Sequence, residues 1–303
     1  LRNEGAAPIG LAGLRFTRGV AFDFTEGAVH TLNPGEFALV VRNLAAFTNR
    51  YPSVAASKIA GAFVFPSTSL DNAGEAIELQ DAAGRTVLSF TYNDGWLAAT
   101  DGAGHSLVPL PGVGQADGEL DYPGNWKASV YIGGSPGADE PAAPAASLVL
   151  NEILAHTDYA VPPYDSNDGI ELYNATAAPV TLGAGWYLSD DPDDLTKWAI
   201  PATHTVAAHG WRWFDEVSDF HAPITSGFGL NKAGEQVLLS YLPGTGEDRV
   251  VDAVSFKGEE NGVPLVRYPD GAASWLYGAP TPGASNRLAG ASVVIGEVMY
   301  HPR

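Results

Sequence analysis

Four aspartates within five residues are the densest group of metal-ligating side chains in the sequence. They lie in the segment SDDPDDLTKW, and their carboxylates are the hard oxygen ligands that calcium requires. The segment lacks the spacing of an EF-hand loop and its closing glutamate. Because aspartate and proline are ordinary turn formers, a solvent-exposed turn is the simpler interpretation. Calcium is the one cofactor to consider, and its candidate ligands are Asp190, Asp191, Asp193 and Asp194.

A second polar pattern is a glutamate followed four residues later by a histidine. It occurs as Glu152 with His156 and again as Glu297 with His301. Both segments are predicted strands, and residues four apart on a strand share a face but lie ~13 Å apart, too far to bind one metal ion. Polar groups at the rim of a strand end are the simpler interpretation.

Two tryptophans in the segment GWRWFDE could form a platform for a sugar. Trp211 and Trp213 share one face of this predicted strand. When the strand is aligned with EFALVV, however, they fall opposite Phe37 and Leu39, the inward positions of an alternating strand. Packing in the core is therefore favoured over ligand binding.

Several motifs of common enzyme classes are missing. We expect no Gly-x-Ser-x-Gly nucleophile elbow, no His-Glu-x-x-His, no phosphate-binding loop and no dinucleotide fingerprint, and the 7 histidines are scattered singly. We therefore predict that the chain is not an enzyme and has no catalytic or cofactor-binding residues.

Composition and charge limit the possible partners. The 303 residues include Lys+Arg 16 and Asp+Glu 35, a formal net charge of −19, which repels phosphate backbones and anionic membranes. Nucleic acid and membrane insertion are not expected, and no apolar run approaches the length of a membrane span. The absence of cysteine excludes disulfides and thiolate metal sites. Because the chain starts at Leu1 without a leader, we expect it to be a segment of a longer protein.

Parts of the chain repeat one another in order. LRNEGAAPIGLAGLRFT, which starts at Leu1, matches LYNATAAPVTLGAGWYLS, which starts at Leu172, in its leucine, asparagine and Ala-Ala-Pro. The strand-like segment SLVLNEILAH (147–156) recurs as SVVIGEVMYH (292–301). Ordered matches of this kind indicate tandem modules.

The positions of these repeats predict a first module that lacks its opening strand. The second module begins with residues 147–156, whereas the first has no equivalent segment and a further copy stands at the C-terminus. We expect a first module at 1–138, an Ala/Pro-rich linker at 139–146 and a complete module at 147–286. Residues 287–303 would be a donor strand or the opening strand of a following module, with interface residues Val293, Val294, Ile295, Val298, Met299 and Tyr300.

Within each module the pattern is mostly that of strands. Apolar and polar residues alternate in 76–81, 86–92 and 250–256, and glycine- and proline-rich turns separate such segments. The one predicted helix covers 43–52, capped by Asn43. Many short strands predict an all-β chain of two tandem immunoglobulin-like β-sandwiches.

The second module resembles a bacterial lamin tail domain. The motifs that carry the resemblance follow one another through the module as NEI, IELYN, GWYLSDD, FGLNKAGEQVLL, VVDAVSF, RYPDGAASW and PTPGASN. The first module is similar to a sister subtype through LRNEGAAPIGLAGLRFT, FTNRYP, AGEAIELQDAAGRTVLSFTY, NWKAS and GGSPG. The resemblance implies an immunoglobulin-like sandwich and a non-catalytic role in assembly or attachment within long secreted or cell-surface chains.

Two functions fit these expectations. In the favoured one, the chain is a structural segment of an extracellular fibre, stalk or surface protein, and copies join head to tail when the C-terminal strand completes the first module of the next copy. In the alternative, the modules form an accessory array that binds carbohydrate or another surface protein beside a secreted enzyme. An exposed aromatic row common to both modules would favour the alternative, and the sequence shows none.

Overall fold

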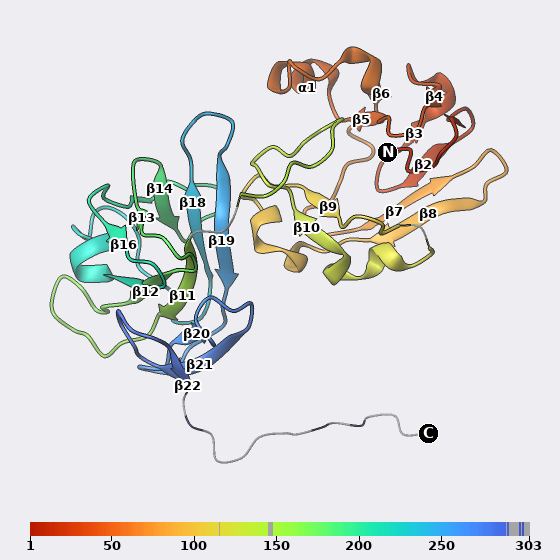
Figure 1. Ribbon diagram of the computed structural model, residues 1–303. Helices are drawn as coiled ribbons and strands as arrows, with labels where there is room; N and C mark the ends of the chain where they lie inside the picture. The colour runs from red at the N-terminus through yellow and green to blue at the C-terminus, as the bar shows by residue number, and fades with distance from the viewer. Residues whose placement is uncertain (115, 145–147, 289, 291–296, 298, 300–303) are drawn as a thin grey trace. The chain divides into compact units, whose positions relative to one another are not determined.

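The chain folds into two compact units, Leu1–Ala143 and Pro144–Arg303. The structure, a computed structural model, describes residues 1–114, 116–144, 148–288, 290, 297 and 299 (Figure 1). The boundary between the units lies inside the expected linker at 139–146. More residues lie in strands than in helices, and the described strand pairs are antiparallel apart from one. The predicted all-β class is therefore confirmed.

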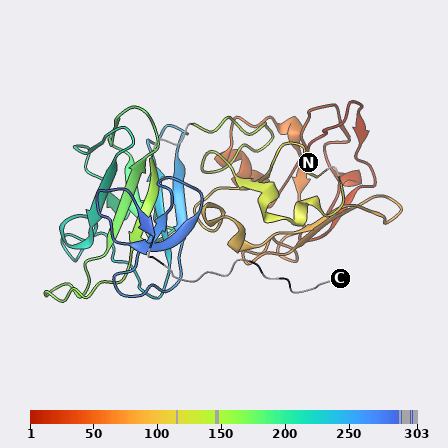
Figure 2. The ribbon, with the colours of Figure 1, turned by 60° about the horizontal axis from the view of Figure 1, so that its bottom comes forward.

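The second unit contains a six-stranded antiparallel sheet with β11 near its middle. The strand order is β17-β12-β11-β20-β21-β22; Figure 1 labels all of these strands except β17, and Figure 2 shows the same unit in green to blue from a second side. β22 pairs with β21, so this sheet extends past residue 286, where the sequence analysis ended the module. The strands cover β11 (Leu148–Leu154), β12 (Gly169–Asn174), β17 (Trp211–Asp215), β20 (Leu265–Arg267), β21 (Trp275–Ala279) and β22 (Arg287–Leu288).

A four-stranded sheet of the same unit packs against the first. Leu150 and Leu172 of the six-stranded sheet and Leu188 and Leu239 of the four-stranded sheet are fully buried in one apolar cluster. Two sheets that share a core form a β-sandwich; the immunoglobulin-like arrangement stays a prediction. The four-stranded sheet contains, in order, β15 (Trp198–Ala199), β14 (Trp186–Ser189), β18 (Gln236–Tyr241) and β19 (Arg249–Ser255), and β13 (Val180–Thr181) pairs with β16 (Thr205–Val206).

The first unit has shorter strands and a smaller core around Phe24 and Leu79. Its largest sheet contains, in order, β3 (Phe22–Asp23), β2 (Arg15–Arg18), β7 (Ala76–Gln80) and β8 (Thr86–Thr91). Its other strands form two-stranded pairs: β1 (Ile9–Gly10) with β4 (Thr31–Leu32), β5 (Leu39–Val41) in parallel with β6 (Ile59–Ala62), and β9 (Leu107–Pro109) with β10 (Trp126–Ala128).

The predicted helix is confirmed as α1 (Leu44–Arg50). The Asn43 side chain caps it by accepting a hydrogen bond from the Ala46 N–H at 2.9 Å. The second unit adds a π-helix, Glu216–Phe220, so the expectation of one helical stretch was incomplete. A single turn is too short to show a helical period in sequence. Short 3-10 turns cover Phe24–Glu26, Ala56–Lys58, Asp94–Trp96, Ala98–Thr100, Glu119–Asp121 and Pro123–Asn125.

A fully buried asparagine closes a turn at the end of β12. The Asn174 amide donates to the carbonyl oxygens of Ala178 at 2.8 Å and Val206 at 3.1 Å. Its side-chain oxygen accepts from the Thr176 N–H at 2.9 Å. One side chain thus supplies hydrogen-bond partners to three backbone groups of this turn.

The first unit has the same turn around Asn3. The Asn3 amide donates to the carbonyl oxygens of Ala7 at 2.9 Å and Leu32 at 2.8 Å, and its oxygen accepts from the Gly5 N–H at 2.9 Å. Residues after Asn3 therefore correspond in structure to residues after Asn174.

We expect the Asn174→Ala variant to lower the free energy of unfolding of the second unit by about 2–4 kcal/mol, because it removes all hydrogen bonds of a fully buried side chain, including the buried bond to the Val206 carbonyl oxygen. Urea denaturation followed by tryptophan fluorescence measures this loss. Thr181→Ala, at an exposed position, is the control and should change stability by less than about 0.5 kcal/mol. Equal effects of both changes would contradict the role given to the asparagine.

Candidate functional site

Residues 1–3 occupy the place that the C-terminal end of β12 has in the second unit. Arg2 forms an antiparallel bridge with Phe37. In the second unit, Tyr173 of β12 pairs with Trp211 of β17 in the same way. The buried-asparagine turn follows directly in both units.

β9 occupies the place of β20. In the β9–β10 pair, Pro109 lies opposite Trp126. In the β20–β21 pair, Arg267 lies opposite Trp275. The second unit has β11 between β12 and β20, whereas the described part of the first unit has no strand between residues 1–3 and β9. We call this place the open strand position.

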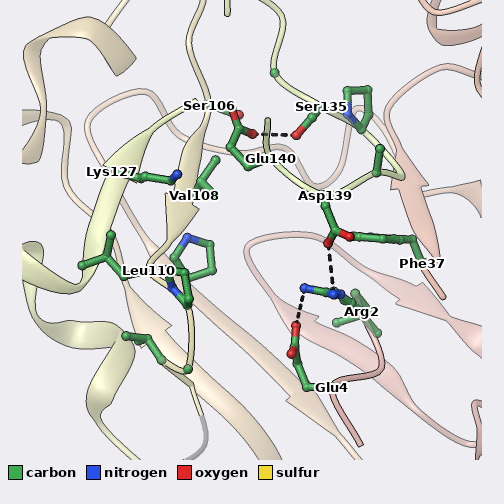
Figure 3. A pocket seen from close by; sticks show the side chains of 18 of the residues that line it. Arg2, Glu4, Phe37, Ser106, Val108, Leu110, Lys127, Ser135, Asp139 and Glu140 are labelled. Atoms are coloured by element: carbon green, nitrogen blue, oxygen red, sulfur yellow. Dashed lines mark hydrogen bonds and ion pairs between the residues drawn. The ribbon is translucent and has the colours of Figure 1, made fainter. Parts of the chain in front are cut away.

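A groove of about 630 Å³ fills the open strand position (Figure 3). Both flanking segments and the turn after β10 contribute to its wall. The aliphatic part of the wall includes Leu1, Val108 and Leu110, and the polar part includes Arg2, Ser106 and Ser135. The groove thus offers apolar contacts along the two segments that a strand equivalent to β11 would join.

Backbone groups are unpaired along one side of this groove. The Ala38 N–H donates to the Leu1 carbonyl oxygen at 2.9 Å, and the Asn3 N–H donates to the Glu36 oxygen at 3.0 Å. Because successive residues of a ladder point in opposite directions, the N–H and C=O of Arg2 point away from this pairing. Neither group has a hydrogen-bond partner among the described residues. An unpaired edge of this kind is a template for another strand.

Charged side chains stand at the rim of the groove (Figure 3). The Arg2 guanidinium contacts the carboxylates of Glu4 at 2.8 Å and Asp139 at 3.0 Å. The Ser135 hydroxyl donates to the Glu140 carboxylate at 2.6 Å. Exposed charges beside an open edge discourage unspecific pairing.

Ser135 lies in GGSPG (133–137), which has the Gly-x-Ser-x-Gly spacing of a nucleophile elbow, so the expectation that the sequence lacks this spacing is wrong. An elbow needs a strand-to-helix turn and a histidine base beside the serine. Here the Ala138 N–H closes a turn on the Ser135 carbonyl oxygen at 3.1 Å, and among the described residues the hydroxyl bonds to Glu140. The segment is a wall of the groove and lacks the geometry of a nucleophile.

The C-terminal strand predicted to pair with another copy lies mostly outside the described residues. Glu297 and Met299 are described, and Met299 is 68% exposed. The pairing of this segment stays a prediction, as does the place of the remaining interface residues Val293, Val294, Ile295, Val298 and Tyr300.

Lys197 and backbone N–H groups engage carboxylates of the candidate calcium loop. Lys197 forms ion pairs with Asp190 at 2.7 Å and with Asp191 at 3.6 Å. Asp191 accepts the Asp193 N–H at 2.9 Å, and Asp194 accepts the Thr196 N–H at 3.0 Å. The bonds from Thr196 also lower the pKa of Asp194. Among the described residues, no three acidic or histidine side chains are gathered as a metal site, and the geometry is that of a turn.

Trp211 and Trp213 do not belong to the core cluster, so the prediction that they pack in the core is wrong. The inward-facing position lies one residue further along the strand. Phe214 is the fully buried residue of β17 and belongs to the core cluster. The two tryptophans are half-buried on the opposite face, where the Trp213 ring covers Gly169 and the Trp211 ring lies 5.8 Å from Tyr173. Because β17 has large apolar side chains on both faces, hydrophobicity alone does not identify the core face.

Glu152 is fully buried and does not lie at a rim as predicted. Its carboxylate accepts from the Thr281 N–H at 3.1 Å and from the Thr281 hydroxyl at 2.7 Å. The Nδ1 atom of His156 lies 3.1 Å from the Glu259 carbonyl oxygen. The two side chains therefore have separate partners on separate segments.

Buried carboxyl groups of the second unit were missed by sequence analysis. Burial raises the pKa of Asp168 to about 8, that of Glu171 to about 8 and that of Glu259 to about 7. The charge of Glu216 raises the pKa of Asp168 further, and the Leu230 N–H offsets part of the shift. Asp168 is fully buried beside a cavity of about 340 Å³, and neither carboxyl oxygen has a partner in ordinary hydrogen-bond geometry among the described residues.

Comparison with protein-family models, with curated proteins and with solved structures found no match to this chain. The resemblance to lamin tail domains therefore stays an expectation. In the described part of the chain, no helix has the length and apolar character needed to cross a bilayer.

We expect millimolar calcium to leave the melting temperature unchanged, because Lys197 neutralises part of the aspartate loop and no three carboxylates of the described residues gather as a metal site. Differential scanning calorimetry with calcium and with a chelator tests this expectation. A rise in melting temperature that Asp191→Asn abolishes would instead support the calcium site.

We expect the second unit to melt at a lower temperature at pH 8 than at pH 5. The folded-state pKa of Asp168, about 8, lies above its ordinary value. Its contribution to stability is therefore complete below about pH 4 and is lost as the pH rises through about 8. Asp168→Asn removes the ionisation, so it should raise the melting temperature at pH 8 and flatten the pH dependence.

Two comparisons make this measurement specific to Asp168. Burial lowers the pKa of His204 in the same unit, so this residue makes stability rise with pH. That contribution is the same in the parent and in the Asp168→Asn variant. Asp193→Asn, at an exposed position, is the matched control and should keep the parental slope. A parental slope in the Asp168→Asn protein would refute the assignment.

Proposed function

We propose that the chain is a non-catalytic structural segment of a large secreted or cell-surface protein and that its copies join head to tail. The joining element is the strand at 292–301, and its receptor is the open strand position of the next copy. The observation that carries the proposal is the groove between residues 1–3 and β9, at the place where β11 lies in the second unit. The likeness to lamin tail domains of long secreted chains is part of the same proposal.

β11 indicates what a strand in this position contributes. It pairs with β12 along one edge and with β20 along the other. Its side chains Leu148, Leu150 and Ile153 are fully buried, and each such burial is worth about 1.5–3 kcal/mol. In the repeat of this strand the corresponding residues are Val293, Ile295 and Val298. Their burial, together with main-chain hydrogen bonds, would offset the loss of freedom on association.

The geometry of this contact leads to linear assembly. The donor strand and the receiving groove are different surfaces of one chain, so each copy can donate at one end and receive at the other. A contact between unlike surfaces does not close a dimer by two-fold symmetry. The product is a string of copies, which suits a fibre, stalk or surface protein.

Deletion of residues 290–303 should abolish self-association. The intact chain should increase in mass with concentration, whereas the truncated chain should stay monomeric, since it has the groove but no donor. Multi-angle light scattering over a hundredfold concentration range measures this. The first unit of the truncated chain should also melt earlier than that of the assembled chain.

A peptide of residues 290–303 provides the control for this deletion. Added in excess, it should occupy the groove, dissolve the assemblies of the intact chain and raise the melting temperature of the first unit. If the intact chain stays monomeric at the highest concentration, strand exchange between copies is wrong. If a chain extended before Leu1 fills its own groove and is monomeric, the same position serves continuation along one chain.

A further inference from the structure

We propose a specific register for the strand that enters the groove: Val294 lies opposite Arg2, and Glu297 lies opposite Val108 with its carboxylate on Ser135. This inference rests on the proposed function and specifies which contacts a second copy makes. The occupant is residues 292–301 of another copy of this chain.

β11 provides the template for the first half of the register. Val149 of β11 lies opposite Tyr173 of β12. Arg2 has the place of Tyr173, because each forms the bridge that precedes the buried-asparagine turn. In the repeat of β11, the residue that corresponds to Val149 is Val294. Val294 therefore meets Arg2, whose free N–H and C=O can form both hydrogen bonds of the pair.

β20 provides the template for the second half. Glu152 of β11 lies opposite Val266 of β20. Val108 has the place of Val266, because each lies one residue before the residue that pairs with a tryptophan. That residue is Pro109 in the first unit and Arg267 in the second. Glu152 corresponds to Glu297 in the repeat. Both halves of the groove thus assign the same alignment of the incoming strand.

The turn after β10 supplies the receptor for the Glu297 carboxylate. In the second unit, Thr281 holds the Glu152 carboxylate with its N–H and its hydroxyl. Ser135 has the place of Thr281, because both precede a Pro-Gly step and both accept a turn-closing N–H, at 3.1 Å for Ser135 and 2.9 Å for Thr281. The Ser135 N–H has no partner among the described residues and lies in the wall of the groove. Glu140, which now holds the hydroxyl, would give up that one bond.

A second difference between the units matches the groove to this strand. In β11, the Asn151 amide donates to the Asp270 carboxylate at 3.1 Å. The incoming strand has Gly296 where β11 has Asn151. The turn after β9 correspondingly has Pro111 and Gly112, with no acid to receive an amide. Donor and groove thus lack the two partners of the same hydrogen bond, so neither leaves the other's side chain unpaired at this position.

Cysteine cross-linking tests the register directly, because the chain contains no cysteine of its own. Residues directly opposite on antiparallel strands bring their Cβ atoms to about 4.5–5.5 Å, which a disulfide can bridge with small adjustment. The matched variant combines Arg2→Cys with Val294→Cys. The control combines Arg2→Cys with Ile295→Cys, which places the second thiol on the opposite face of the strand. The matched variant should form covalent multimers at least about ten times faster under mild oxidation.

The outcomes separate the register from the proposed function. If copies assemble by light scattering but the control variant cross-links faster, the register is wrong and the assembly stands. If neither variant assembles or cross-links, both the register and the head-to-tail assembly fail. A cross-linked single chain, which migrates faster on a non-reducing gel, would show that the strand folds back onto its own groove and would overturn the second-copy occupant.

The Glu297 contact is tested in the chain without cysteines. Glu297→Ala should weaken self-association about tenfold or more, since it removes the acceptor of charge-assisted hydrogen bonds. Glu260→Ala, another exposed glutamate, is the control and should leave association unchanged. In a Ser135→Ala background the Glu297→Ala change should have a smaller effect, because the two groups act on one contact. Equal weakening in both backgrounds would overturn the pairing of these residues.

Discussion

Hydrogen bonding along both edges of one strand, β11, is the constraint on which the second unit depends. β11 joins β12 and β17 on one side to β20, β21 and β22 on the other, so the six strands form one sheet. The described part of the first unit has no strand in the corresponding place. The counterparts of the two sides stay separate there, as the bridge of Arg2 to Phe37 and the two-stranded pair of β9 and β10.

Polar side chains around β11 fix its register in the second unit. The Asn286 amide donates to the carbonyl oxygens of Asn151 and Arg267, both at 2.9 Å. The Arg267 guanidinium donates to the Leu150 oxygen at 2.7 Å and to the Asp252 carboxylate at 2.9 Å. A slip of β11 by one residue would turn its side chains to the opposite faces and leave these buried groups unpaired. The network therefore contributes specificity as well as stability, and it is the reason that β11 is a usable template for an incoming strand.

Sequence predicted those features that depend on neighbouring residues. The all-β class follows from alternation and turn residues, and α1 follows from its cap at Asn43. Features that depend on distant partners were missed. Glu152 is buried because Thr281, 129 residues away, holds its carboxylate. The position of the Trp213 ring depends on Gly169, because a side chain at Gly169 would overlap the ring. No local pattern records such contacts, because the partner is chosen by the fold and not by spacing along the chain.

Polar groups at the groove of the first unit can make an open edge selective for one strand. A bare edge with an apolar wall would pair with many extended segments. At the rim of this groove Arg2 forms ion pairs with Glu4 and Asp139, and the Ser135 hydroxyl donates a hydrogen bond to Glu140. In the proposed register, an apolar strand without a carboxylate at the position of Glu297 would leave the Ser135 N–H unpaired. Selectivity then comes from the polar groups that a wrong strand leaves unsatisfied, while apolar burial supplies affinity to any strand that fits.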